Sequence, residues 1–386
     1  MSSYYPPLNY IVPPSEDGWL LKTILQKRMD ISRKLLSRLK MTEQGIMLNG
    51  ERIYISVKVA AGDRVEIRME QETSEDILPQ DIPFDILYED EHLLVVNKAA
   101  GIIVHPTHGH YTDTLANGVV HYWAAKGEKY RFRPVHRLDQ ETSGVLVIAK
   151  NPYSHQHISE QMIAGTVDKR YAAFVHGVPA SPAGDIDGPI DRDPAEPHRR
   201  IVTPDGYPSL TRYEVKEVYG DRAARVELKL ETGRTHQIRV HMSSIGCPLI
   251  GDGMYRHPLY GRGPGASAGA DGNAAEAVPA DAQELAGIAG PEPAELPLAV
   301  QELTSEEAPV LAELSGLDPG RELTAEEAVQ LAGVAGLDAA IPRQALHAVR
   351  LSFKHPVGLE ELVFEAPLPP DMALLEQKLR EDAGGE

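Results

Sequence analysis

One stretch near the middle of the chain, residues 134–150, most constrains its fold, because it joins a polar loop to a buried strand. Arg137 and Asp139 stand two positions apart in the loop, beside a Thr-Ser-Gly turn. The apolar run 145–150 follows directly and is typical of a strand inside a sheet. A carboxylate at the mouth of such a strand can act as a nucleophile or a general base, and a neighbouring arginine can pair with it, hold phosphate or stack on a base. An isolated Arg-x-Asp would more simply indicate an ion pair that fixes a turn.

The length of 386 residues is too great for one ordinary core, so we expect two or more domains. A hydrophobic content of 42% suits a soluble globular protein, and no apolar run approaches the length of a membrane span. The first ten residues lack the pattern of an export signal. The single Cys247 excludes an internal disulfide framework and a cysteine metal cage. These features predict a cytoplasmic protein.

The net charge of −19 is unevenly distributed along the chain. Residues 264–340 hold fifteen acidic residues and one basic residue, whereas residues 20–70 hold eleven basic and six acidic residues. Because phosphate binding depends on local patches more than on the total charge, the second segment is a candidate RNA-binding surface.

Residues 1–14 are rich in Tyr and Pro and predict an extended tail, and residues 15–72 predict a small basic module. Apolar spacing predicts one helix from Gly18 and another from Ser32, which is a suitable N-cap. Asn49-Gly50 predicts a hairpin turn, and a final strand ends near residue 67. Three basic residues of the second helix are expected to face solvent and to bind RNA, although a solvated helix face would show the same pattern: Arg33, Lys34 and Arg38.

A polar linker is predicted at residues 73–81, followed by a region of strands and helices. We expect a hairpin at 84–98, a helix at 151–165 capped by Asn151, and strands at 167–177 and 222–230. A Thr-Gly-Arg turn then puts Arg234 at a helix N-terminus, with Thr235 as the cap and Gly246 as the C-terminal stop.

These motifs together resemble the RluA-type pseudouridine synthases. The resemblance rests on His-Arg-Leu-Asp-x-x-Thr-Ser-Gly at 136–144, Lys-x-Tyr at 169–171 and Gly-Arg-Thr-His-Gln-Ile-Arg at 233–239, and it spans residues 20–260 and 342–372. The basic module resembles the small RNA-binding module of a small-subunit ribosomal protein and of tyrosyl-tRNA synthetases. Many pseudouridine synthases carry that module at the N-terminus.

The resemblance implies roles for five residues around one uridine. It makes Asp139 the carboxylate near C1′ and makes Tyr171 the residue that stacks on the base and handles the C5 proton. It has Arg234 pair with Asp139, and it makes Arg137 the wedge that fills the gap left by the flipped nucleotide. Leu351 matches a position lining the uracil pocket, although a core leucine is nearly as consistent with its pattern.

The resemblance also implies the architecture and the partners. We expect an α+β catalytic domain at 82–260 and 342–386, with a mixed, mainly antiparallel sheet and a central cleft. The expected substrate is large-subunit ribosomal RNA, with tRNA second, and the expected enzyme is a monomer without cofactor. His105, His108 and His110 lack a nearby carboxylate or cysteine, so we predict no metal. The alternatives are a non-catalytic RNA-binding or ribosome-assembly protein, an RNA N-glycosylase and an interaction hub.

Residues 261–341 depart from the family pattern. They are rich in Ala, Gly and Pro, and the segment 302–308 recurs as 322–328. Each copy starts with a capping box, which would allow short amphipathic helices. Because the acidic composition without aromatic residues cannot build much core, we predict a mostly disordered insertion.

Overall fold

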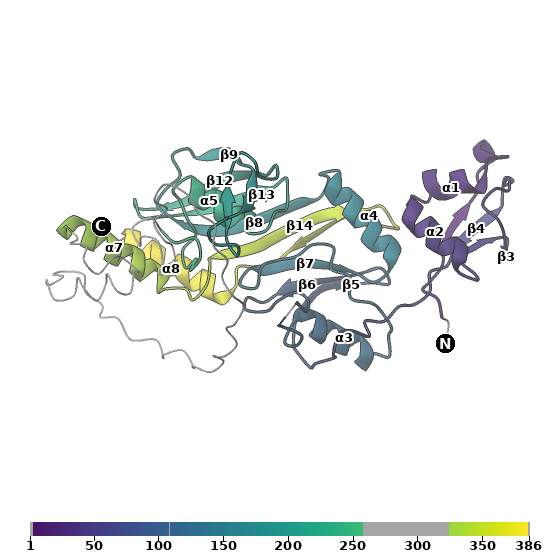
Figure 1. Cartoon of the computed structure of the whole chain (residues 1–386), viewed down its shortest axis with the longest axis horizontal. Helices are drawn as coiled ribbons and strands as arrows, with labels where there is room; N and C mark the ends of the chain where they lie inside the picture. The colour runs from purple at the N-terminus through teal and green to yellow at the C-terminus, as the bar shows by residue number, and fades with distance from the viewer. Residues whose placement is uncertain (1–2, 108, 258–323, 385–386) are drawn as a thin grey trace, which may run out of the picture.

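The N-terminal residues fold into a small module around one antiparallel sheet (Figure 1). The computed structural model describes residues 3–107, 109–257 and 324–384. The strands of the module lie in the order β1-β4-β2-β3 and are β1 (Leu8–Ile11), β2 (Ile46–Leu48), β3 (Glu51–Arg52) and β4 (Arg64–Ile67). A 3₁₀ turn, η1 (Pro14–Glu16), and two helices, α1 (Leu21–Lys27) and α2 (Arg33–Met41), complete the module. Apolar side chains of the helices and the sheet give it a core of its own.

Local sequence signals account for α2 and for the hairpin. The Ser32 hydroxyl accepts a hydrogen bond from the Leu35 amide at 3.2 Å, which confirms Ser32 as the N-cap. Asn49 and Gly50 have φ angles of 52° and 85°, the left-handed pair that a two-residue hairpin turn requires. Both predicted helices and the turn of the module are therefore confirmed, although the first helix begins at Leu21 and not at Gly18.

The predicted N-terminal tail is wrong for residues 8–11, which form an edge strand of the module. β1 pairs with β4 from Leu8 opposite Ile67 to Ile11 opposite Arg64. Tyr5 and Val12 flank this strand and are buried in the core of the module. Four residues bracketed by prolines are too few to show a clear alternating pattern, and the partner strand lies at the other end of the module's sequence.

The large domain is built on one mixed sheet of nine strands among the described residues. Its order is β5-β6-β7-β14-β8-β13-β12-β9, with β15 paired to β14, and β7 and β14 are parallel. The strands are β5 (Asp85–Glu89), β6 (Leu93–Lys98), β7 (Ser143–Ala149), β8 (Asp168–His176), β9 (Ala183–Asp187), β12 (Leu210–Tyr219), β13 (Ala223–Leu230), β14 (Leu346–Lys354) and β15 (Glu361–Glu365). The predicted mixed, mainly antiparallel sheet is confirmed.

Helices cover both faces of this sheet near β6 and β7. Leu94 and Val96 pack towards α3 (Leu115–Ala125), whereas Leu93 and Val95 pack towards α4 (Pro152–Ile163). Successive strand residues point to opposite sides of the sheet, so a helix on each face buries all four of them. The other half carries α5 (Gln237–Ser244) and a small hairpin of β10 (Ile190–Arg192) and β11 (Arg200–Val202).

Two helices lie at the end of the molecule opposite the module (Figure 1). The first of them lies in the last part of the predicted insertion. They are α7 (Ala325–Asp338) and α8 (Pro370–Gly384). Leu337 and Ile341 join the apolar cluster of α8, and Asp338 Oδ1 lies 2.7 Å from His176 Nε2. The predicted insertion is therefore wrong in its boundary, because residues 324–341 belong to the packed domain. Residues 258–323 lie outside the described part of the chain.

The module contacts the large domain through α4. The side chain of Gln156 accepts a hydrogen bond from the Ser32 amide at 3.1 Å and donates one to the Asp30 carbonyl at 2.8 Å. The rings of Tyr5 and Tyr130 stack with centroids 5.8 Å apart. These contacts hold α2 in a defined position relative to the large sheet.

Candidate active site

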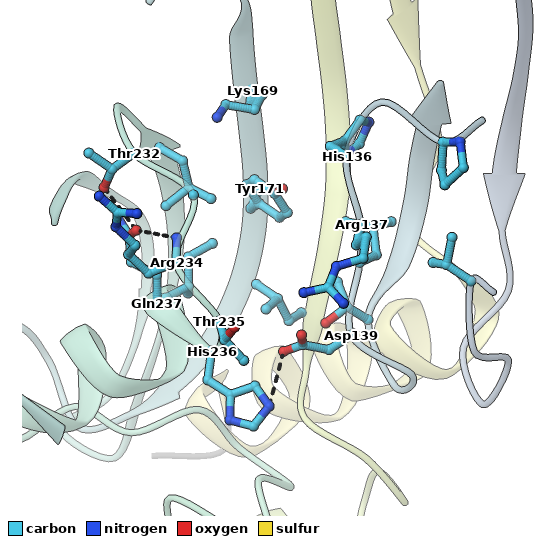
Figure 2. A pocket seen from close by; sticks show the side chains of 18 of the residues that line it. His136, Arg137, Asp139, Lys169, Tyr171, Thr232, Arg234, Thr235, His236 and Gln237 are labelled. Carbon is cyan, nitrogen blue, oxygen red and sulfur yellow. Dashed lines mark hydrogen bonds and ion pairs between the residues drawn. The ribbon is translucent and has the colours of Figure 1, made fainter. Parts of the chain in front are cut away.

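A cleft of about 900 Å³ opens between the two halves of the large domain (Figure 2). Its walls come from residues 103–107, the loop 134–142, the end of α4, the start of β8 and the segment 230–239. Asp139, Tyr171, Arg137 and Arg234 all line it, although they are distant in sequence. The predicted central cleft is confirmed.

Asp139 sits in the loop that enters β7. The Thr142 amide donates to the Asp139 carbonyl at 3.1 Å, which closes the turn. Gly144 has φ +116°, and a Cβ there would lie 2.3 Å from the Ala348 carbonyl oxygen. Only glycine lets the loop enter β7 directly beside β14, so the Thr-Ser-Gly turn is dictated by packing.

Two buried cations hold the backbone of this loop. Lys98 Nζ donates to the carbonyls of Ala99, Ile102 and Gln140 at 2.7–2.8 Å. Burial lowers the pKa of Lys98 to about 7, while the three carbonyls match the three donors of its ammonium form. Arg343 Nη1 donates to the Glu141 carbonyl at 2.9 Å. The two residues that follow Asp139 are thus fixed from two sides.

The cation that faces Asp139 is Arg239. Its Nη1 lies 3.6 Å from Asp139 Oδ2, while its Nε and Nη2 donate to the two carboxylate oxygens of Asp252 at 2.7 and 2.8 Å. Burial disfavours the charge of Arg239, but the hydrogen bonds and the charge of Asp252 outweigh it and raise its pKa. The guanidinium is therefore charged, held by Asp252 and directed at Asp139.

His236 provides a second contact to the same carboxylate. Its Nε2 lies 3.9 Å from Asp139 Oδ2, and its Nδ1 lies 3.0 Å from the Tyr255 hydroxyl (Figure 2). Burial lowers the pKa of His236, and this effect is larger than the opposing one of Asp139. A neutral imidazole beside Asp139 leaves Arg239 as the main positive charge there.

The predicted pair between Asp139 and Arg234 is wrong. Figure 2 shows Arg234 on the other wall of the cleft, beside Thr232 and Gln237. Arg234 Nε donates to the Pro208 carbonyl at 3.3 Å, and its guanidinium lies 5.4 Å from the centre of the Tyr207 ring. The motif contains two arginines, and the one inside the helix is the one that reaches the carboxylate.

The predicted cap at Thr235 is also wrong, and this explains where the two arginines point. α5 begins at Gln237, after His236 in the left-handed conformation, with φ 57°. Gln237 Oε1 accepts hydrogen bonds from the Arg234 amide at 2.9 Å and from the Thr232 hydroxyl at 2.8 Å. The turn is therefore closed by Gln237, which leaves the Arg234 side chain outside the helix. Gly246, with φ +80°, follows the last turn as predicted.

Tyr171 lies on β8, between the two walls (Figure 2). It is only 7% exposed, yet it lines the cleft together with Leu230 and Ile238. Burial raises the pKa of Tyr171, and the negative charge of Asp139 raises it further. The site thus presents a protonated phenol with an apolar surround, which suits a planar base.

Three further cleft residues differ in burial and in role. Arg137 is exposed at the mouth and makes no ion pair among the described residues. His136 accepts a hydrogen bond from the Val147 amide at 3.3 Å, and burial lowers its pKa to about 3. Burial also lowers the pKa of Lys169. His136 is therefore a structural acceptor, whereas Arg137 is available to a ligand. His108 of the adjacent histidine-rich loop lies outside the described residues.

Leu351 does not line the cleft, so the prediction that it contacts uracil is wrong. It is 2% exposed and packs with Val147 and Ile158, on the face covered by α4. Leu346, at the start of the same strand, lines the cleft instead. A register irregularity in the pairing of β14 with β8 lies between these two positions and defeats simple counting along the strand.

The three predicted RNA-binding residues of the module, Arg33, Lys34 and Arg38, lie on the exposed face of α2. Arg33 and Lys34 make no ion pair with any described residue. Arg38 instead forms an ion pair with Glu72, which also pairs with Arg133 of the large domain. Arg38 therefore contributes to fixing the module, and Arg33 and Lys34 are the uncompensated charges.

The comparisons with known proteins agree with this geometry. The family described as RNA pseudouridylate synthase matches residues 92–244, which include Asp139, Tyr171 and Arg239. The chain is 33% identical over 348 residues to a Bacillus subtilis protein named uncharacterized RNA pseudouridine synthase YjbO, covering 90% of this chain and 95% of that protein. This chain belongs to the RNA pseudouridine synthase family. It is accordingly an isomerase that acts on RNA.

Two further proteins are similar to this chain. The ribosomal large subunit pseudouridine synthase D of Xanthomonas campestris is 33% identical over 374 residues, which cover 97% of this chain and 92% of that one. The solved human RNA pseudouridylate synthase domain-containing protein 4 has a TM-score of 0.47 and 26% identity, covering 77% of this synthase and 93% of the human chain. Within the described residues of the synthase, no helix combines the length and apolar character needed to cross a bilayer.

Proposed function

We propose that this synthase converts uridines of large-subunit ribosomal RNA to pseudouridine, with Asp139 as the essential carboxylate. The observation that carries the proposal is the position of Asp139, in the cleft beside Arg239 and on a loop held by Lys98 and Arg343. The choice of ribosomal RNA is supported by the names of the near full-length relatives.

The reaction breaks the C1′–N1 bond of uridine, turns the free uracil and joins C1′ to C5. The C5 proton is lost and N1 gains one, so no oxidant, reductant or energy source is consumed. Asp139 either attacks C1′ or removes the 2′ proton to give a glycal-like intermediate. In either route Arg239 stabilises the ionised carboxylate and fixes its direction.

Tyr171 is suited to retain the detached base and to handle the C5 proton. Its ring offers a stacking face in the cleft, and the charge of Asp139 raises its pKa in addition to the effect of burial. In the direct-attack route the carboxylate becomes a neutral ester, which removes that charge. The pKa of the phenol then falls at the stage where a base for C5 is needed.

The cleft admits one nucleotide extruded from its stack. Extrusion costs a few kcal/mol, and a wedge that replaces the lost stacking partner reduces this cost. Arg137 is exposed at the mouth of the cleft and has no described ion-pair partner, so it is suited to this role. Arg33 and Lys34 would supply phosphate contacts away from the cleft.

The test is to map pseudouridines in the total RNA of a strain that lacks the protein. We expect the loss of one or more pseudouridines in large-subunit ribosomal RNA, their return with the wild-type gene, and no return with Asp139→Asn. An unchanged ribosomal map with a missing tRNA pseudouridine would redirect the substrate. Free uracil and abasic sites in RNA treated with the purified protein would instead indicate an N-glycosylase.

A further inference from the structure

We propose that Tyr207 and Arg234 form a second RNA contact at the rim of the cleft, which stacks the base and holds the phosphate of a nucleotide adjacent to the flipped uridine. This inference rests on the proposed function. It assigns a role to Arg234, which lies on the opposite wall of the cleft from Asp139.

Arg234 is an exposed cation without a compensating charge. It lines the cleft, and among the described residues its side chain makes only the Nε hydrogen bond to the Pro208 carbonyl and the contact with the Tyr207 ring. Its two terminal nitrogens are therefore available to an anion. Glu231, the acidic residue beside it in the lining, is already paired with Arg212 at 3.0 Å and Lys229 at 3.7 Å.

Tyr207 presents an exposed ring on a fixed backbone. Tyr207 is 63% exposed. Its amide and carbonyl each bond to the backbone of Ile190 at 2.9 Å, and the Ser209 hydroxyl donates to the same carbonyl at 2.8 Å. A Cβ on Gly206 would lie 2.7 Å from the Ile190 backbone, so glycine is needed for this close pairing. The backbone that carries the aromatic ring is thus fixed, and the ring is left uncovered.

The two side chains suit a nucleotide better than another ligand. Single-stranded bases stack on tyrosine rings and on arginine planes, and a guanidinium also binds phosphate. Arg234 lies on the wall opposite Asp139, across the cleft that takes the target uridine (Figure 2). The neighbouring nucleotide of an extruded uridine must leave the cleft over its rim. Because stacking tolerates any base, this contact adds affinity without selecting one sequence.

The experiment uses the full-length protein and an RNA oligonucleotide carrying a uridine that the wild type modifies. We expect Tyr207→Ala and Arg234→Ala to raise KM about 5- to 10-fold, the lower part of the range for base–aromatic stacking, and to leave kcat unchanged. Tyr207→Phe should keep the wild-type KM. A 2-aminopurine placed 5′ or 3′ of the uridine should be quenched by the wild type at one of these positions, and Tyr207→Ala should abolish that quenching.

Two exposed residues of α8, which contributes nothing to the cleft lining, serve as controls. Leu374→Ala removes an exposed apolar side chain, and Arg380→Ala removes an exposed cation, so both should keep wild-type KM and quenching. An unchanged KM in Tyr207→Ala, with an active wild type, would overturn the rim contact and leave the proposed function standing. A loss of kcat in Arg234→Ala as large as in Asp139→Asn would also overturn it. A wild type that forms no pseudouridine on any RNA would overturn both proposals.

Discussion

Arg239 directs Nη1 at the carboxylate of Asp139, 3.6 Å away, while its other two nitrogens bind Asp252 at 2.7 and 2.8 Å. Asp252 has a fully buried side chain, so the guanidinium is fixed before any substrate arrives. A planar fork held on one side can orient a carboxylate on the other, which a single ammonium cannot do. The preorganisation of Asp139 therefore depends on a residue that makes no contact with it, namely Asp252.

Replacing Arg239 by lysine tests this arrangement. Arg239→Lys keeps the charge but removes the two-point contact with Asp252, so we expect kcat to fall about 100-fold, as for a small misplacement of a reacting group. Steady-state kinetics measures the effect, with KM expected to change little. Arg170→Lys, which alters a surface pair with Asp168 and Glu227, is the matched control. Equal kcat values for the two variants would show that the fork does not orient Asp139.

Leu351→Ala should act on stability and not on substrate binding. The side chain is buried between β14 and α4, so its truncation should cost about 2–5 kcal/mol of unfolding free energy. Chemical denaturation measures this change, and KM measured well below the unfolding transition should match the wild type. A raised KM with wild-type stability would return Leu351 to the uracil pocket.

Salt dependence should distinguish the three predicted RNA-binding residues of α2, Arg33, Lys34 and Arg38. Removing one side chain that binds a phosphate should reduce the slope of log affinity against log salt by about 0.7–0.9. We expect this for Arg33→Ala and Lys34→Ala, and a smaller change for Arg38→Ala, because Arg38 pairs with Glu72. Titrations of labelled RNA between about 50 and 200 mM salt give the slopes. Arg350→Ala, which breaks a pair with Glu365, is the control, and a slope change there as large as for Lys34 would contradict the assignment.

Acid should destabilise the fold through His347. This residue is fully buried, its Nδ1 accepts from the Ser143 hydroxyl at 2.8 Å, and its Nε2 donates to the Ala366 carbonyl at 3.2 Å. Burial lowers its pKa from 6.5 to about 4. Between these values the unfolded chain binds a proton that the native state does not, so stability falls as pH drops, by up to about 1.4 kcal/mol per unit.

His347→Gln keeps a donor and an acceptor at this position without a titrating group. Unfolding free energies of the variant should therefore fall less steeply between pH 6.5 and 4 than those of the wild type. Parallel denaturation series measure the difference, which cancels the contribution of all other titrating groups. Superimposable pH profiles would show that His347 is not buried in its neutral form.

The sequence is sufficient for features that depend on neighbours along the chain. The cap at Ser32, the Asn49-Gly50 turn and the buried strand β7 all follow from adjacent residues, and the structure confirms each. The long motifs that contain Asp139 and Tyr171 likewise predict a common cleft, and both residues line it. Errors arise where a distant partner decides the outcome, as for β1, which needs β4, and for α7, which needs α8 and His176.

The same contrast between features set by sequence neighbours and features set by distant partners applies to single side chains of the site. Arg234 and Arg239 stand in one motif, and only the backbone at His236, with its left-handed conformation, decides which of them faces Asp139. Lys98 and Arg343, which hold the loop of Asp139, belong to no motif that predicts this role. A lysine at the end of a mainly apolar strand is the one available signal, because a buried ammonium requires carbonyl partners nearby.

The role of Asp139 is tested most directly by nucleoside chromatography of an RNA substrate incubated with purified wild-type protein and with Asp139→Asn. The substitution removes the charge and keeps the shape of the side chain. We expect pseudouridine with the wild type, none with the variant, and equal RNA affinity for both. Pseudouridine formed by Asp139→Asn at the wild-type rate would contradict this role.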